Sequence, residues 1–239
     1  DKINFITNKN YFFFYIIKAF LHLIKYAIAR LPFSRLKRLP FSSKGNEINV
    51  FSYFSHFDSI NKEEKKFSQS YWGPLLNHLI SAGYKVNWIH FFLSTKEVPS
   101  HKKAIFLINY FNKERSNTHQ MFESYLSISV ILNAILVYFK VIVKSLHSSQ
   151  YFNVTYPDGD MLSLKDVLEE DFYQSIYGSY GIQNALKYLL FEKMFKKNKF
   201  SNTVFYLYEN QNWEHLLLFF YKKNYKKGKL IAYQHATVP

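Results

Sequence analysis

The chain has 239 residues, of which 48% are hydrophobic and 20% are aromatic, so it can form a packed core and lacks the composition of a disordered segment. It contains no cysteine, which excludes disulfides, cysteine-ligated metals and a thiol nucleophile. Its formal net charge of +14 predicts an anionic partner, for which nucleic acid, an anionic membrane surface, and phosphorylated or acidic sugars are the three candidates.

The first 46 residues form a basic N-terminal segment. Residues 1–44 contain nine Lys or Arg and one acid, a net charge of 9 − 1 = +8. The apolar stretch Tyr11–Leu31 is interrupted by Lys18, His22, Lys25 and Arg30, and its uncharged runs are shorter than a spanning helix needs. We expect a basic amphipathic helix that lies on a membrane surface. The alternative is a helix that packs on the domain and turns a basic face to solvent.

Short apolar runs in the next part of the chain predict the first strands of a sheet. Glu47–Phe54, Lys85–Phe92 and Ala104–Phe111 each combine β-branched and aromatic residues over the length of a strand. Tyr71–Ala82, between the first two runs, has the pattern of a helix, and Gly83 is a suitable C-terminal stop. We therefore expect a strand, a helix and two further strands.

Two longer stretches predict helices. Met121–Leu146 is apolar, but its 16 uncharged residues between Glu123 and Lys140 are too few to span a membrane, so we expect a core helix that covers one face of the sheet. Leu164–Phe195 is mostly helical in pattern, with a break near residues 178–181.

The last 37 residues predict a strand, a helix and a second strand, at Thr203–Tyr208, Trp213–Tyr221 and Lys229–Tyr233. Strands that alternate with helices along the chain predict an α/β fold with a Rossmann-like parallel sheet and helices on both faces. Such sheets bind ligands beyond the carboxyl ends of their strands. Polar residues that directly follow a strand are therefore the first candidates for a site.

Glu209 and His235 each follow one of these last strands. A carboxylate at the position of Glu209 suits a general base or a group that binds hydroxyls, and its alternative role is to cap the next helix. A histidine at the position of His235 suits contact with a phosphate or proton transfer, and its alternative is a loop residue with ordinary hydrogen bonds.

Three further candidates lie near the first strand and the first helix. His56 and Asp58 follow the strand with a spacing that suits a metal, but no third ligand is near in the sequence, so contacts with an acceptor or loop hydrogen bonds are the better interpretation. Trp72 either stacks on a sugar ring or fills the core.

Residues in the middle of the chain are weaker candidates. Asp171, together with Ser175, Gly178 and Ser179, is a candidate to line the cleft at the strand ends, although a place on a helix surface is the default for these residues. Asp158 and Asp160 have Asp-x-Asp spacing within a Pro-Asp-Gly turn, where turn formation is the ordinary role of aspartate. We expect no metal site.

The motifs of phosphate-loop NTPases, classical dehydrogenases and α/β-hydrolases are missing. Other segments are more informative, namely FSYFSHFDS, FSQSYWGPLLNHL, VNWIHFF, DFYQSIYGS, NALKYLLFE, YLYENQNWEHLL and IAYQHATVP. Together they resemble bacterial surface-carbohydrate (O-antigen) biosynthesis proteins of the glycosyltransferase-B kind. The resemblance covers residues 47–239 and is most specific in the Glu-Asn-Gln-x-Trp-Glu string.

The resemblance implies one half of a two-domain enzyme whose Rossmann-like domains face each other across a cleft. Residues 47–239 would form the N-terminal, acceptor-side domain, and the donor domain would follow residue 239. The reaction would transfer a sugar from a nucleotide-sugar donor to a lipid-linked glycan acceptor, without a cofactor. The enzyme would act in the cytoplasm, peripheral to the inner face of the bacterial cytoplasmic membrane, and the fragment alone would be inactive.

The resemblance also implies roles for individual residues. Glu209 would be the base or the carboxylate that orients the acceptor, and His235 would contact the donor phosphate or the acceptor. Asp58 and Asp171 are second-line catalytic candidates, since a retaining mechanism needs a carboxylate nucleophile. The implied substrate-binding residues are His56, Trp72, Gln211, Trp213, Gln234, Gly178 and Ser179.

The residues are also compatible with two other functions. One is a polyol-phosphate transferase of the teichoic-acid kind, which also combines a two-domain fold with a histidine at a strand end. The other is a non-catalytic module that binds carbohydrate or nucleic acid, which the positive charge favours. The Glu-Asn-Gln-x-Trp-Glu string favours glycosyl transfer over both.

Overall fold

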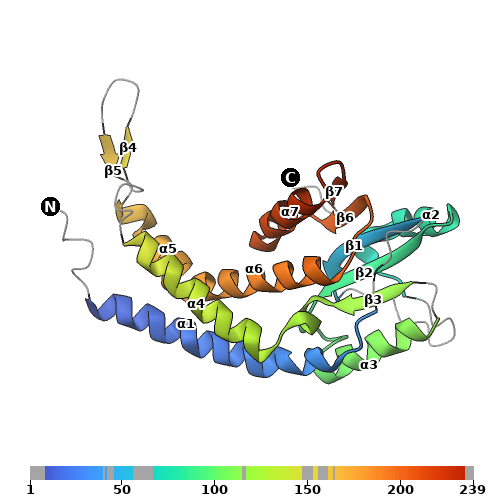
Figure 1. Cartoon of the computed structure of the whole chain (residues 1–239), viewed down its shortest axis with the longest axis horizontal. Helices are drawn as coiled ribbons and strands as arrows, with labels where there is room; N and C mark the ends of the chain where they lie inside the picture. Colours follow the sequence, from blue (N-terminus) through green and yellow to red (C-terminus); the bar gives the residue numbers. More distant parts are fainter. Residues whose placement is uncertain are drawn as a thin grey trace. The chain divides into compact units, whose positions relative to one another are not determined.

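The chain divides into two compact units, each of which is described here by itself (Figure 1). Unit 1 holds residues 1–28 and 128–189, and unit 2 holds residues 29–127 and 190–239. The computed structural model describes residues 9–39, 41, 46–55, 67–114, 117–146, 153–155, 161–163 and 165–234.

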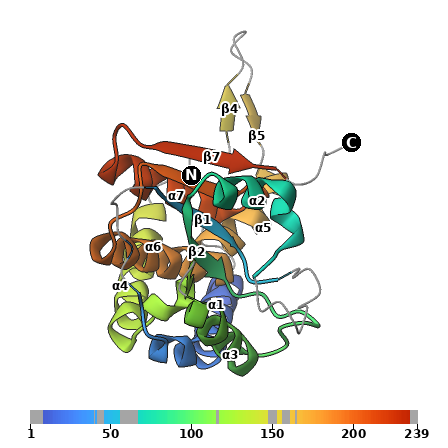
Figure 2. The ribbon, with the colours of Figure 1, turned by 90° about the vertical axis from the view of Figure 1, so that its right-hand side faces the viewer.

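Unit 2 is built on a parallel β-sheet, which confirms the predicted Rossmann-like α/β fold (Figure 2). Within the described residues the sheet has five strands in the order β3-β2-β1-β6-β7, and every neighbouring pair is parallel. The strands are β1 (Glu47–Tyr53), β2 (Lys85–Phe91), β3 (Thr118–Met121), β6 (Thr203–Leu207) and β7 (Lys229–Tyr233).

Helices connect these strands, as a parallel sheet requires. They are α2 (Gly73–Ser81) before β2, α3 (His101–Phe111) before β3, and α7 (Asn212–Asn224) between β6 and β7. The described part of the same unit also contains the short 3-10 turns η2 (Leu31–Arg35), η3 (Ser70–Trp72), η4 (Asn112–Glu114) and η5 (Phe122–Tyr125).

Both faces of the sheet are covered, because successive side chains of a strand point to opposite sides. On one face, Val50 of β1 belongs to a buried cluster with Leu76 of α2. On the other face, Phe91 of β2 packs on Trp213 of α7, with ring centroids 4.4 Å apart. The central strands β1 and β2 are therefore buried along most of their length on both sides, whereas the edge strand β7 is exposed or half-buried.

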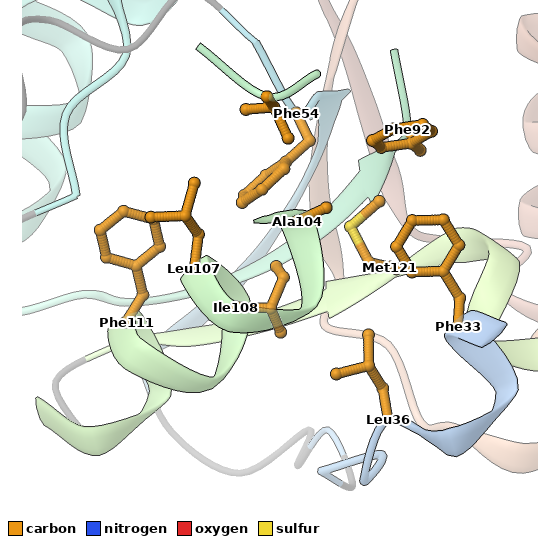
Figure 3. Packing of buried hydrophobic residues seen from close by; sticks show 10 residues of the cluster. Phe33, Leu36, Phe54, Phe92, Ala104, Leu107, Ile108, Phe111 and Met121 are labelled. Atoms are coloured by element: carbon orange, nitrogen blue, oxygen red, sulfur yellow. The ribbon is translucent and has the colours of Figure 1, made fainter. Parts of the chain in front are cut away.

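The prediction of a third strand at Ala104–Phe111 is wrong, because this segment forms most of helix α3 (Figure 3). Ser100 caps the helix, since its Oγ accepts the N–H of Lys103 at 3.3 Å. The buried residues Ala104, Leu107, Ile108 and Phe111 follow helical spacing and pack against Phe33, Leu36, Phe54, Phe92 and Met121. A continuous apolar run fits a buried strand and a buried helix equally well. Here the cap and the spacing favour the helix. The third strand is Thr118–Met121 instead.

Unit 1 is mainly helical. Its helices are α1 (Lys9–Arg30), α4 (Ile128–Ser145), α5 (Lys165–Ile176) and α6 (Ser179–Lys197). The strands β4 (Asn153–Thr155) and β5 (Met161–Ser163) pair as an antiparallel hairpin. The last residues of α1 and of α6 belong to unit 2. Inside the unit, the Tyr138 hydroxyl of α4 donates to the carbonyl of Tyr177, and the Phe20 ring of α1 meets Tyr138 edge-on.

The predicted helix Met121–Leu146 is shorter in the structure. Its first residue belongs to β3, the 3-10 turn η5 follows, and α4 begins only at Ile128. The helix belongs to unit 1, whereas the sheet belongs to unit 2, and several of its large apolar side chains are exposed. The expectation of a core helix is therefore only half right, because α4 has one buried and one exposed apolar side.

We expect the Leu107→Ala variant to lose about 2–5 kcal/mol of unfolding free energy, because Leu107 is buried in α3 and its removal leaves a cavity. The matched control is the neighbouring Phe106→Ala, which removes a ring that is 60% exposed and should cost no more than about 0.5 kcal/mol. Urea unfolding followed by tryptophan fluorescence measures both. A larger loss for Phe106→Ala than for Leu107→Ala would contradict the helical placement of these residues.

Candidate functional site at the switch point of the sheet

At one position in the sheet, two neighbouring strands are followed by connections that run toward opposite edges of the sheet. From β1 the chain continues outward to β2 and β3, whereas from β6 it continues outward to β7 on the other side. The carboxyl ends of β1 and β6, which pair directly with each other, therefore flank a topological switch point. Open α/β sheets bind their ligands in the crevice at this place.

The loop after β6 is fixed by a second glutamate in the Glu-Asn-Gln-x-Trp-Glu string. Oε1 of Glu214, in the first turn of α7, accepts the backbone N–H groups of Glu209 at 2.9 Å and Gln211 at 2.8 Å. Asn210 between them has a φ of 58°, a left-handed conformation that asparagine tolerates better than most residues. The carboxylate of Glu214 is buried, so these two hydrogen bonds also satisfy a charge that would otherwise be costly.

Trp213 anchors the same loop to the end of β1. Its indole is buried, and its Nε1–H donates to the hydroxyl of Tyr53 at 3.0 Å. Together, Asn210, Trp213 and Glu214 have local structural roles. Glu209 has none of this kind, because its half-buried carboxylate forms no hydrogen bond with the residues that the structure describes.

Two tyrosines share the switch point with the Glu209 carboxylate. Tyr53 is the last residue of β1, and Tyr71 lies in the 3-10 turn that leads into α2. Burial raises the pKa of Tyr53 to about 12, and the negative charge of Glu209 acts in the same direction. Burial also raises the pKa of Tyr71, again with a contribution from Glu209. Both hydroxyls therefore stay protonated at neutral pH. The Tyr53 hydroxyl accepts from Trp213 and can still donate, and the Tyr71 hydroxyl is hydrogen-bonded with Ser55.

The remaining predicted site residues of unit 2 have different surroundings. Gln234 follows β7 at the same edge of the sheet and is exposed, as is Gln211. Trp72 is 1% exposed, donates from Nε1 to Ser52 Oγ at 3.0 Å and stacks on Tyr233, so in this structure it fills the core.

Other predicted residues lie in unit 1 or outside the described part of the chain. Asp171 is exposed on α5. Gly178 and Ser179 lie at the junction of α5 and α6, where a Cβ on Gly178 would come within 2.9 Å of the backbone of Gln174, so this turn requires glycine. His56, Asp58, Asp158, Asp160 and His235 fall outside the residues that the structure describes. Within those residues, no group of three or more His, Asp or Glu is placed to hold a metal ion.

Sequence reasoning missed Tyr53 and Tyr71 as members of the site. The sequence does contain a signal for each, since Tyr53 is the last residue of the first strand and Tyr71 precedes the first helix after it. What it could not show is that β6 pairs with β1, which brings these tyrosines to Glu209.

A buried histidine pair in the sheet is a second polar cluster of unit 2. His90 Nε2 and His119 Nδ1 lie 3.1 Å apart, and both rings stack in parallel with Trp88. Burial lowers the pKa of His119 to about 3 and also lowers that of His90, helped by the neighbouring imidazole. The pair is therefore neutral and inside the core, which suits packing and hydrogen bonding rather than chemistry on a ligand.

Comparison with known proteins finds no relative: the chain matches no protein-family model, no curated protein and no solved structure. The resemblance to surface-carbohydrate glycosyltransferases therefore stays a prediction from the residues themselves.

We expect Glu214→Ala to destabilise unit 2 by about 0.5–2 kcal/mol, because two backbone N–H groups at the start of α7 lose their acceptor. Glu209→Ala is the matched control, since it removes a carboxylate five residues earlier that caps nothing, and it should leave stability almost unchanged. Urea denaturation of both variants measures the difference. Equal losses would show that the loop is not held by Glu214.

We expect stability to fall as the pH is lowered from 7 to 5. The unfolded histidines take up protons near their ordinary pKa of about 6.5, whereas the buried pair stays neutral, so protons favour the unfolded chain by up to about 1.4 kcal/mol per pH unit for each histidine. Urea unfolding at several pH values measures the slope. The His119→Gln variant should show a shallower slope, and His215→Gln, which changes an exposed histidine of α7, should not. A stability that does not change between pH 7 and 5 would contradict this prediction.

Proposed function

We propose that unit 2 binds the hydroxyl groups of a sugar acceptor at the switch point, as the acceptor-side domain of a glycosyltransferase. The observation that carries this proposal is the Glu209 carboxylate, which forms no hydrogen bond among the described residues. Its charge acts on the neutral hydroxyls of Tyr53 and Tyr71.

The charge at this position favours hydroxyls over phosphates. A carboxylate accepts hydrogen bonds from uncharged hydroxyl groups but repels a phosphate, and the two phenols next to it remain neutral. The sequence also contains no glycine-rich phosphate loop. These features support an uncharged, polyhydroxylated ligand at the switch point and give less support to a polyol phosphate or a nucleic acid there.

Glu209 also suits the chemistry of sugar transfer. The acceptor hydroxyl must lose a proton as it attacks, and a carboxylate within hydrogen-bond distance either takes that proton or orients the hydroxyl. The loop geometry supports this role, because Glu214 and Trp213 hold the backbone on both sides of the Glu209 side chain. The donor in this proposal is a nucleotide sugar, the acceptor is a lipid-linked glycan, and the reaction takes place on the cytoplasmic face of the membrane.

We expect the Glu209→Gln variant to bind sugars at least about tenfold more weakly, since hydrogen bonds to a charged group are worth about 1.5–3 kcal/mol. Saturation-transfer NMR measures this with the 239-residue chain and the methyl glycosides of glucose, galactose, N-acetylglucosamine and rhamnose.

Glu192→Gln is the matched control for this experiment. It makes the same change on α6, at a residue that forms an ion pair with the exposed Lys196, four residues along the helix, at 3.1 Å. We expect it to bind sugars like the unmodified chain. Equal binding by Glu209→Gln, or tight and steeply salt-dependent binding of mixed oligonucleotides in place of sugars, would contradict the proposal.

A further inference from the structure

Helix α1 carries a row of exposed apolar side chains along one side. The six residues are Phe13, Phe14, Ile17, Leu21, Ile24 and Ile28, and each is more than half exposed. From Phe14 onward they are spaced alternately by three and four residues, which places them on one face of a helix. The opposite face carries the buried residues Tyr15, Ala19 and Leu23. The helix therefore has two apolar faces, of which unit 1 covers only one.

Helix α4 has the same arrangement. Its buried side contains Val130, Ala134, Tyr138 and Ile142. Its other side exposes a second row, spaced by three or four residues, which consists of Ile128, Leu132, Leu136, Phe139 and Val143 and continues to Leu146 just past the end of the helix.

The two rows are neighbours within unit 1. The ring of Phe139 in the α4 row packs on Phe20 of α1, with centroids 6.0 Å apart. Phe20 is half-buried and lies beside the α1 row, three residues after Ile17 and four before Ile24. We call the two rows and Phe20 together the α1–α4 apolar face. A contiguous exposed apolar surface of this kind indicates a binding partner.

The charges next to the α1–α4 apolar face all have the same sign. Lys18 follows Phe14 by one helical turn and Lys25 follows Leu21 by one turn, while Lys140 and Lys144 follow Leu136 by one and two turns. Neither α1 nor α4 contains a single Asp or Glu. Lysines beside an apolar row can extend their alkyl stems along it and keep the ammonium group in water.

We infer that the α1–α4 apolar face binds the surface of an anionic lipid bilayer, with both helices lying in the plane of the interface. The apolar rows enter the boundary between head groups and acyl chains, and the four lysines contact anionic head groups. A second copy of the chain fits this face poorly, because it would bring lysines against lysines with no carboxylate on either helix to pair with them.

Spanning the bilayer is the other arrangement that composition allows. Contrary to the expectation from their short uncharged runs, Phe12–Arg35 and Ile128–Ser145 are each long and apolar enough to cross a membrane, as buried core helices and signal sequences also are. Lys18 and Lys25, however, lie in the middle part of the first segment, where a charge in the hydrocarbon is costly. Both are exposed beside the apolar row, which suits an interfacial position.

Vesicle co-sedimentation of the 239-residue chain tests this inference. We expect binding to vesicles that contain phosphatidylglycerol, and at least about tenfold weaker binding to pure phosphatidylcholine vesicles or in 0.5 M salt. Leu21→Glu and Leu136→Glu should each weaken binding at least about tenfold, since each places a carboxylate in the apolar row. The double variant Lys18→Gln/Lys25→Gln should weaken it by about fivefold per lysine.

Matched controls come from exposed residues of unit 2. Leu218→Glu changes an exposed leucine of α7, and Lys226→Gln/Lys227→Gln removes two exposed lysines, so these variants should bind vesicles like the unmodified chain. Unchanged binding by Leu21→Glu and Leu136→Glu would overturn the inference. A dimer that light scattering detects and that Leu21→Glu dissociates would also overturn it, because the face would then bind a second copy. Retention in the membrane after carbonate extraction would overturn it as well, because the helices would then span the bilayer. The face and the switch-point site involve different residues, so either proposal can fail without the other.

Discussion

The two hydrogen bonds that the buried Glu214 carboxylate accepts from the backbone of Glu209 and Gln211 determine the shape of the candidate site. They fix the turn between the end of β6 and the start of α7, with Asn210 in a left-handed conformation at its centre. The Trp213 indole then ties this turn to Tyr53 on the neighbouring strand β1. The buried Glu214 therefore stabilises the loop, whereas the carboxylate of Glu209, five residues before it, can contact a ligand.

The parallel sheet makes this division of roles useful. Because β1 pairs with both β2 and β6, the first strand and the strand at residues 203–207 end side by side although they are about 150 residues apart. There the charge of a carboxylate from one segment acts on phenols from two other segments. Burial keeps the phenols neutral, since it raises the pKa of Tyr53 and of Tyr71. The proposed preference for uncharged hydroxyls follows from this combination of one negative charge and two neutral hydrogen-bonding groups.

Much of the fold could be predicted from local sequence patterns, and what could not depends on contacts between distant residues. The alternation of strands and helices predicted the Rossmann-like sheet, and the bounds of β7 were predicted to the residue. The apolar run 104–111 was assigned to the wrong element because buried strands and buried helices share a composition; the capping Ser100 was the missed local signal. For the site, position after a strand identified Glu209, but Tyr53 and Tyr71 required the pairing of β1 with β6.

A sugar that binds at the switch point beside Glu209 can be detected through the chain's three tryptophans. Trp213 donates its indole N–H to Tyr53 at the site, whereas Trp88 stacks on the buried histidines in the sheet. Each indole N–H gives its own signal in a ¹⁵N-correlated NMR spectrum. Titration with the methyl glycosides should shift the Trp213 signal and leave that of Trp88 in place. A sugar that binds without moving the Trp213 signal, or that moves only the signal of Trp88, would contradict binding at the switch point.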